Sequence, residues 1–155
     1  MSEVTVRQAT VDDLPAVQKL ATGLMVSHLP YDPLLEKDWY YHAAGKKYVL
    51  TSLKGRNHVC FLAEIDGQAV GYLRGSLCNE TWLRVKRSEL DNLFIADAYR
   101  RHGAGNKLLA AFRDWSQQKG AKKIKVVVSA LNKEALPFYE MNGFKTRQLE
   151  MEAEI

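Results

Sequence analysis

The N-terminal third of the chain combines two hydrophobic periods. Residues 4–8 alternate apolar and polar side chains, which predicts a short strand. An amphipathic helix follows, because apolar residues recur at intervals of three and four and would form one buried stripe: Leu14, Val17, Leu20 and Leu24. A second helix is expected over residues 35–53, although Gly45 weakens that pattern.

The middle of the chain predicts a β-hairpin. Residues 57–65 and 69–77 are strand-like runs, and Asp66-Gly67 lies between them. This dipeptide suits the positive φ angles of a tight turn. The two runs should therefore pair as neighbouring antiparallel strands.

A parallel pair of strands is expected next. Residues 89–95 form a strand, residues 106–118 an amphipathic helix and residues 123–129 a valine-rich strand. This succession implies a right-handed parallel crossover. A fourth helix should start near Leu136, because Pro137 fits only its first turn, and residues 144–155 should supply one or two closing strands.

The length and composition indicate a single mixed α/β domain over residues 1–155. Hydrophobic residues make up 46% of the chain and charged residues 26%, which are ordinary globular values. No apolar run approaches the ~20 residues that span a bilayer, and the N-terminus does not resemble a signal peptide, so we expect a cytoplasmic protein without a membrane partner.

Charge and cysteine content exclude further classes of site. The net charge of +4 is modest, and the basic residues lack interleaved aromatic residues, so we expect no nucleic-acid partner. A basic surface of this kind would attract a polyanionic cofactor. Cys60 and Cys78 lack metal-ligand spacing, and we expect no metal.

The stretch at residues 100–105 predicts a phosphate-binding loop. Gly103 and Gly105 allow a tight turn, and the helix that follows directs unpaired N–H groups and its positive dipole end at an anion. The dinucleotide fingerprint does not fit, because Leu108 stands where it requires a small residue. The P-loop pattern fails as well, since Lys107 is followed by leucine rather than by serine or threonine.

This loop, the strand at residues 91–95 and the NKEALPFYEMNGF segment at residues 132–144 resemble the GNAT-type N-acetyltransferase superfamily over nearly the whole chain. The resemblance implies a GNAT-like acyl-CoA N-acyltransferase fold, a mixed sheet of about seven strands with about four helices. It also implies a bulge in the central strand and a V-shaped gap beside it that holds acetyl-CoA. The cofactor-binding residues would be Leu93, Phe94, Ile95, Arg100, Arg101, His102, Gly103, Ala104, Gly105, Asn106 and Asn132.

The same resemblance assigns the catalytic groups. Tyr139 stands where similar enzymes carry a phenol beside the CoA sulfur, and packing on the preceding helix is the alternative for it. Asp91 or Glu89 would draw the proton from the ammonium, and a surface carboxylate is the alternative for both. Asn132 could equally form an Asx turn before the helix.

The acceptor would be a primary amine, on a small molecule or a peptide N-terminus. The acceptor-facing loop of the family corresponds to the segment that contains His28, Tyr31 and Asp32. A non-catalytic acyl-CoA-binding or regulatory module is the alternative from another class, and a homodimer is left open. The sequence thus predicts an acetyl-CoA-dependent N-acetyltransferase.

Overall fold

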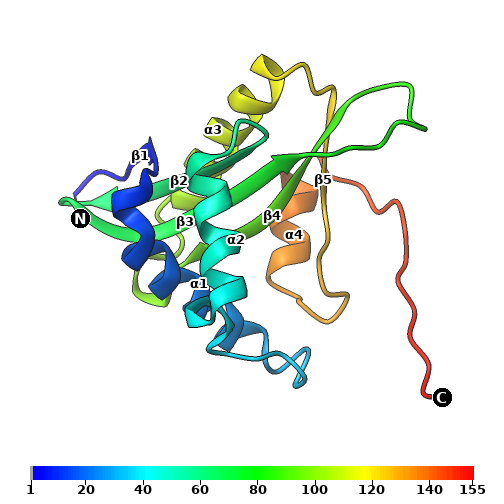
Figure 1. Cartoon of the computed structure of the whole chain (residues 1–155), viewed down its shortest axis with the longest axis horizontal. Coiled ribbons are helices and arrows are strands. Elements are labelled where there is room, and N and C mark those ends of the chain that lie inside the picture. Colours follow the sequence, from blue (N-terminus) through cyan, green and yellow to red (C-terminus); the bar gives the residue numbers. More distant parts are fainter. Residues whose placement is uncertain (1) are drawn as a thin grey trace.

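Five strands form one mixed sheet in the computed structural model, which describes residues 2–155 (Figure 1). They lie side by side in chain order, and only the last pair, β4 with β5, is parallel. The strands are β1 (Thr5–Gln8), β2 (His58–Ile65), β3 (Gln68–Leu77), β4 (Arg87–Ile95) and β5 (Lys123–Val126).

Helices cover both faces of this sheet. Helices α1 (Leu14–His28) and α2 (Ala43–Lys54) pack on one face, where Val17, Val49 and Tyr72 belong to one buried cluster. Helix α3 (Ala104–Gln118) packs on the other face with Leu90 in a second cluster, to which α4 (Ala135–Met141) contributes its tyrosine. Three short 3₁₀ turns complete the structure: η1 (Val11–Asp13), η2 (Trp39–Tyr41) and η3 (Asp97–Tyr99).

The expected hairpin is confirmed, and its turn has the predicted backbone. Asp66 has φ 51° and Gly67 has φ 76°, and these two residues connect β2 to β3. Both angles match the twist that a two-residue hairpin needs. The crossover from β4 through α3 to β5 and the four α-helices are confirmed too.

Two irregularities of β4 create the site. Arg74 of β3 pairs with Asn92, but its neighbour Gly75 pairs with Leu90, so Asp91 is an extra residue in a bulge. On the other side, the pairing of β4 with β5 ends at Leu90 and Val126. Beyond that point the two strands separate, and the outer half of β4 has no strand beside it on the β5 side among the described residues.

Three expectations need correction. The sheet has five strands rather than about seven, because residues 144–155 pair with no strand and run away from the body of the protein (Figure 1). The last strand ends at Val126 rather than at residue 129. The second helix begins at Ala43 because Gly45 packs directly on the backbone of Trp39, which folds into the preceding 3₁₀ turn.

No helix in residues 2–155 combines the length and the apolar character that a membrane crossing requires.

Candidate functional site

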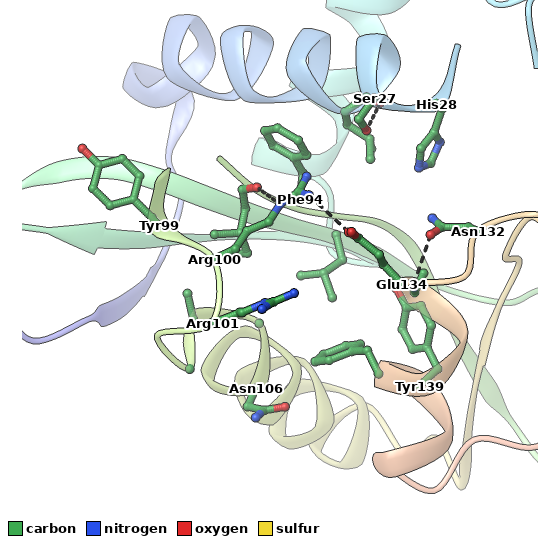
Figure 2. Close-up of a pocket in the computed structure, with 18 residues that line it drawn as sticks. Ser27, His28, Phe94, Tyr99, Arg100, Arg101, Asn106, Asn132, Glu134 and Tyr139 are labelled. Carbon is green, nitrogen blue, oxygen red and sulfur yellow. Dashed lines mark hydrogen bonds and ion pairs between the residues drawn. The ribbon is translucent and has the colours of Figure 1, made fainter. Parts of the chain in front are cut away.

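A pocket of about 330 Å³ lies where β4 ends and α3 begins (Figure 2). The end of α1 and the start of α4 form its other walls. Most of the residues expected to bind the cofactor line it: Leu93, Phe94, Ile95, Arg100, Arg101, Gly103, Ala104, Gly105, Asn106 and Asn132. The sequence therefore located the components of one contiguous pocket.

The loop before α3 is shaped as an anion site. Gly103 precedes the helix with φ 82°, a conformation that only glycine adopts readily, and no side chain caps the first turn. The first backbone N–H groups of α3 are therefore free to bind a ligand. Arg101 has φ 64°, which is uncommon outside glycine, and its side chain is directed into the pocket (Figure 2).

Arg100 holds the loop in place rather than leaving its charge free. Its Nε donates to the backbone oxygen of Ile95 at 3.0 Å, and its other nitrogens contact Asp97 at 3.0 Å and Glu134 at 3.5 Å. The Nδ1 atom of His102 lies 2.6 Å from the Arg100 backbone oxygen, and His102 does not line the pocket. Arg101 is therefore the loop arginine available to a phosphate.

Gly105 allows α3 to approach α4 closely. A Cβ atom at this position would lie 3.3 Å from the Phe138 ring, which is tighter than usual contact. Asn106 continues this contact, because its Oδ1 accepts a hydrogen bond from Asn142 at 3.2 Å. The second glycine of the motif thus sets the spacing of the two helices that flank the pocket.

A second pocket of about 370 Å³ lies between the bulged part of β4 and the segment that continues β5. It is lined by the bulge of β4, by residues 126–129 and by residues of α1 and of the segment after it, including Leu35 and Tyr40. The two pockets share one wall, formed by Leu24, His28, Leu93, Asn132, Ala135 and Tyr139. Two ligands could therefore meet across this wall.

Tyr139 lies in the shared wall and is held by its ring. Only 8% of the residue is exposed, and the ring packs edge-to-face on Phe138 and Phe144 with centroids 5.2 and 5.3 Å away. Burial raises the pKa of Tyr139 to about 12. Because that pKa lies well above neutrality, the phenol keeps its proton and can donate it.

Asp91 projects from the bulge into a cluster of polar groups. Its Oδ2 accepts hydrogen bonds from Arg74 at 2.7 Å and from Ser76 at 3.1 Å. The Arg74 guanidinium lies 3.6 Å from the centre of the Tyr48 ring, and the Tyr48 hydroxyl donates to Asn92 at 3.3 Å. Burial raises the pKa of Asp91, and Arg74 opposes that rise.

Asp91 and Glu89 differ in whether their side chains border a pocket. Asp91 lines the second pocket, whereas Glu89 does not line either pocket and contacts Lys125 at 3.3 Å. Arg74 and Ser76 both contact Oδ2 of Asp91, which leaves Oδ1 for an incoming group. Of the two carboxylates, only Asp91 therefore borders a pocket that a ligand could occupy.

The remaining candidate site residues also differ in whether they line a pocket. Asn132 caps the start of α4, because its Oδ1 accepts from the Ala135 N–H at 3.0 Å, and its side chain also borders both pockets. His28 borders both pockets, and burial lowers its pKa. Tyr31 and Asp32 line neither pocket; the Tyr31 ring lies 6.2 Å from the His28 ring.

The groups that surround Asp91 were not among the residues expected from the sequence. Arg74 is 6% exposed and lies between apolar residues in the middle of β3. A charged residue inside such a strand needs a buried partner, and this was the signal that could have identified it. Tyr48 carried no such signal, because a tyrosine on an amphipathic helix normally packs in the core.

Comparison with known proteins identifies the chain. The sequence model of the acetyltransferase (GNAT) family matches residues 21–144, which include the loop, the bulged strand and Tyr139. The chain belongs to the GNAT family. This confirms the expected family and enzyme class, an acetyl-CoA-dependent N-acetyltransferase.

Similar GNAT sequences cover most of the chain. An uncharacterized N-acetyltransferase of Bacillus subtilis, YhfO, is 28% identical over 148 residues, which are 92% of this chain and 90% of the relative. An N-alpha-acetyltransferase of Sulfurisphaera tokodaii is 25% identical over 150 residues, covering 92% of this chain and 81% of the relative.

Solved structures confirm the fold of this GNAT protein. A mutant of the BH1408 protein from Bacillus halodurans superimposes with a TM-score of 0.86 at 18% identity, covering 97% of this chain and 99% of that one. The aminoglycoside N-acetyltransferase AAC(6′)-Iy in complex with CoA superimposes with a TM-score of 0.77 at 20% identity, covering 100% and 96%.

The residues of the first pocket fit the donor of the family. The uncapped start of α3 and the Arg101 side chain suit a pyrophosphate, and the unpaired outer half of β4 suits an amide-bearing arm. Arg100 already occupies the backbone oxygen of Ile95, so the arm would pair with other groups of the strand. Residues 2–155 contain no group of three or more His, Cys, Asp or Glu side chains arranged to hold a metal ion.

Proposed function

We propose that this GNAT enzyme transfers the acetyl group of acetyl-CoA directly to a primary amine, with both substrates bound at once. The observation that carries the proposal is the shared wall of the two pockets, which has Tyr139 in it and Asp91 in the lining of one pocket. Holding a donor and a nucleophile in adjacent sites lowers the barrier by positioning alone. No covalent enzyme intermediate is required.

The donor occupies the first pocket in this proposal. The N–H groups at the start of α3 and Arg101 bind its pyrophosphate, and the outer half of β4 aligns its arm toward Tyr139. Tyr139 protonates the leaving thiolate, since its pKa of about 12 leaves the phenol protonated at neutral pH and the thiolate is the group that takes up a proton.

The acceptor amine occupies the second pocket. Asp91 offers its free Oδ1 to the ammonium group and takes its proton directly or through water. Arg74 and Ser76 orient the carboxylate by holding the other oxygen, Oδ2. Arg74 also opposes the rise in the pKa of this buried carboxyl, which favours the ionised form that a base requires.

The acceptor class is an amine on a small molecule or at a peptide N-terminus. The Sulfurisphaera tokodaii relative is named an N-alpha-acetyltransferase, and the structural neighbour AAC(6′)-Iy is an aminoglycoside N-acetyltransferase. The second pocket, at about 370 Å³, has room for an amino sugar or the first residues of a peptide.

A panel of amines tests the proposal. Peptides with free and blocked N-termini, amino sugars and simple amines are each incubated with acetyl-CoA, and thiol release is measured together with the mass of the acceptor. We expect an acetylated acceptor and thiol release that depends on it. Thiol release at the same rate without any amine, and no acetylated product across the panel, would contradict the proposal.

A further inference from the structure

The second pocket combines one acidic group with a wall that is otherwise largely apolar. Within residues 2–155, Asp91 is the only carboxylate in its lining, and no lysine or arginine lines it. Apolar side chains reach it from α1, from the segment after α1, from β4 and from the segment that continues β5: Met25, Leu35, Leu90, Leu93, Val127 and Val128. A ligand in this pocket therefore meets one negative charge surrounded by apolar surface.

The polar side chains of the same wall offer few free acceptors. The Oδ1 atom of Asn92 accepts from the Tyr48 hydroxyl at 3.3 Å, and the Oδ1 atom of Asn132 accepts from a backbone N–H of α4 at 3.0 Å. The Ser129 hydroxyl oxygen accepts from a backbone N–H at 3.3 Å. Burial lowers the pKa of His28, so its ring is uncharged at neutral pH. Hydroxyl groups of a ligand would therefore lose water here without gaining equivalent partners.

Two adjacent leucines in the segment after α1 differ in their relation to this pocket. Leu35 is half-buried and lines it, whereas Leu34 is 90% exposed and does not. Asp32 holds both in place, because its backbone oxygen accepts from the Leu35 N–H at 3.3 Å and its Oδ1 accepts from the Leu34 N–H at 3.1 Å. Leu35 belongs to neither buried cluster, so its side chain forms pocket surface rather than core.

We propose that the acceptor is a primary amine with a single positive charge and an apolar group beside it, and that Leu35 helps to select it. This inference rests on the proposed function and narrows its acceptor. The ammonium group binds Oδ1 of Asp91, and the apolar group covers Leu35 and the valines after β5. A second ammonium group would be buried without a carboxylate, and the carboxylate of a free amino acid would lie near Asp91 without a cation.

A series of n-alkylamines tests the apolar contact in the native enzyme. Propylamine to hexylamine carry the same ammonium group, and kcat/KM should rise about fourfold with each methylene, because each buries more apolar surface. 1,5-Diaminopentane matches hexylamine in length but ends in a second ammonium group, and its kcat/KM should be at least about tenfold lower. A flat series or a preference for the diamine would overturn the inference and leave the proposed reaction intact, since amines would still be acetylated.

A second set of acceptors tests the carboxylate and distinguishes a free amine from a peptide. 3-Methylbutylamine is leucine without its carboxylate, and it should exceed leucine and glucosamine in kcat/KM at least about tenfold. Peptides that begin with leucine should exceed peptides that begin with aspartate. A higher kcat/KM for the leucine peptide than for 3-methylbutylamine would identify peptide N-termini as the source of the amine, and the reverse order would identify free amines. A preference for leucine or glucosamine over 3-methylbutylamine would overturn the inference.

Leu35→Glu tests the role of this side chain, because it adds a second carboxylate to the pocket lining. The ratio of kcat/KM for 1,5-diaminopentane to that for hexylamine should rise at least about tenfold. Leu34→Glu is the matched control, since it adds the same charge one residue away and outside the pocket, and it should keep the native ratio. An unchanged ratio in Leu35→Glu, or an equal change in both variants, would contradict the role of Leu35.

Thermal unfolding separates binding from the reaction. With CoA at saturation, hexylamine should raise the Tm of the native protein more than 1,5-diaminopentane does, and Leu35→Glu should reverse that order. This order does not require acetyl transfer, so it decides the inference even if no amine is acetylated and the proposed function fails. A larger Tm shift with the diamine in the native protein would overturn the inference.

Discussion

Burial acts on Tyr139 and Asp91 in the same direction, and it affects the two groups differently. It raises the pKa of the phenol to about 12, so the phenol is protonated at neutral pH but is a weaker acid than an exposed phenol, and it raises the pKa of the carboxyl, so the carboxylate becomes a stronger base. Arg74 opposes the second effect and favours the ionised carboxylate. The two groups thus have distinct tasks although the same low-polarity surroundings tune them.

Replacement of Tyr139 by phenylalanine should separate the role of the hydroxyl as proton donor from the role of the ring in packing. The ring contacts with Phe138 and Phe144 remain, so the free energy of unfolding should hardly change. Loss of the proton donor should lower kcat by about 10²–10⁴, with the Kd for acetyl-CoA nearly unchanged. Kinetics and calorimetric titration measure these values, and a variant that keeps most of its kcat would show that the phenol is structural.

Replacement of Asp91 by asparagine should change the pH dependence of the rate. In the native enzyme kcat/KM falls as the pH decreases through the pKa of Asp91, because protonation removes the base. The variant should lose most activity at the acidic end and partly recover at high pH, where the amine is already deprotonated. Glu89→Gln is the comparison, and the same loss there with a normal Asp91→Asn profile would reverse the assignment.

At the level of elements, the start of α1 depends on one carboxylate. Asp13 accepts from the Thr10 N–H at 2.8 Å and binds Arg7 of β1 with both oxygens at 2.8 Å. These contacts, the Arg7 hydrogen bond above all, lower the pKa of Asp13 from 3.8 to about 2. The residue therefore joins the first strand to the first helix.

Asp13→Asn should lower the free energy of unfolding and make it less dependent on pH in the acidic range. Because the folded pKa is depressed, its stabilising contribution is present above the unfolded pKa of 3.8 and disappears as the pH falls through about 2. Arg7 is 44% exposed, so we expect a loss of only about 1 kcal/mol at pH 7. Urea unfolding between pH 2 and pH 7 measures it, with the exposed neighbour Asp12→Asn as the control that should change little.

Some of the structural elements could be predicted from the sequence, and others could not. The hairpin and the loop before α3 were predictable, because Asp66, Gly67 and Gly103 need positive φ angles that only certain residues adopt. The pattern of residues 144–155 wrongly predicted closing strands, since a strand forms only with a partner, and the bulge at Asp91 was not predictable from the residues, since a bulge depends on pairing across two strands. The expectation of a bulge came instead from the family resemblance.

The residues of the site also differ in how far the sequence could predict them. Most residues of the first pocket lie in two short segments of sequence, 93–106 and 132–139, so motifs could locate them. The cluster of Tyr48, Arg74 and Asp91 joins three distant elements, and no local pattern indicates such a meeting. Tyr31 and Asp32 were expected at the acceptor side because of their position in the chain, yet only His28 of that group reaches a pocket.

For the whole molecule, acetyl-CoA should stabilise the fold. At a hundredfold excess over Kd the ligand adds about 2.7 kcal/mol, which raises the Tm of a domain of this size by roughly 5–11 °C. Gly103→Ala should reduce this shift, because a side chain strains the backbone that directs N–H groups at the phosphates.

Gly120→Ala is the matched control for that experiment. Gly120 has the same φ of 82° at the other end of α3 and does not line either pocket. It should lose a similar amount of stability and keep the full shift with acetyl-CoA. No shift in the native protein, or an equal loss of the shift in both variants, would contradict the role of the loop.

The shared wall between the two pockets also has a kinetic consequence. Both pockets are partly open to solvent, so we expect each substrate to enter its own pocket directly. Neither substrate then has to wait for the other to enter, and either product can leave first. Rates measured over a grid of both concentrations should therefore follow a sequential scheme without obligatory order, and a single compound that links the two substrates across Tyr139 should bind far more tightly than either part.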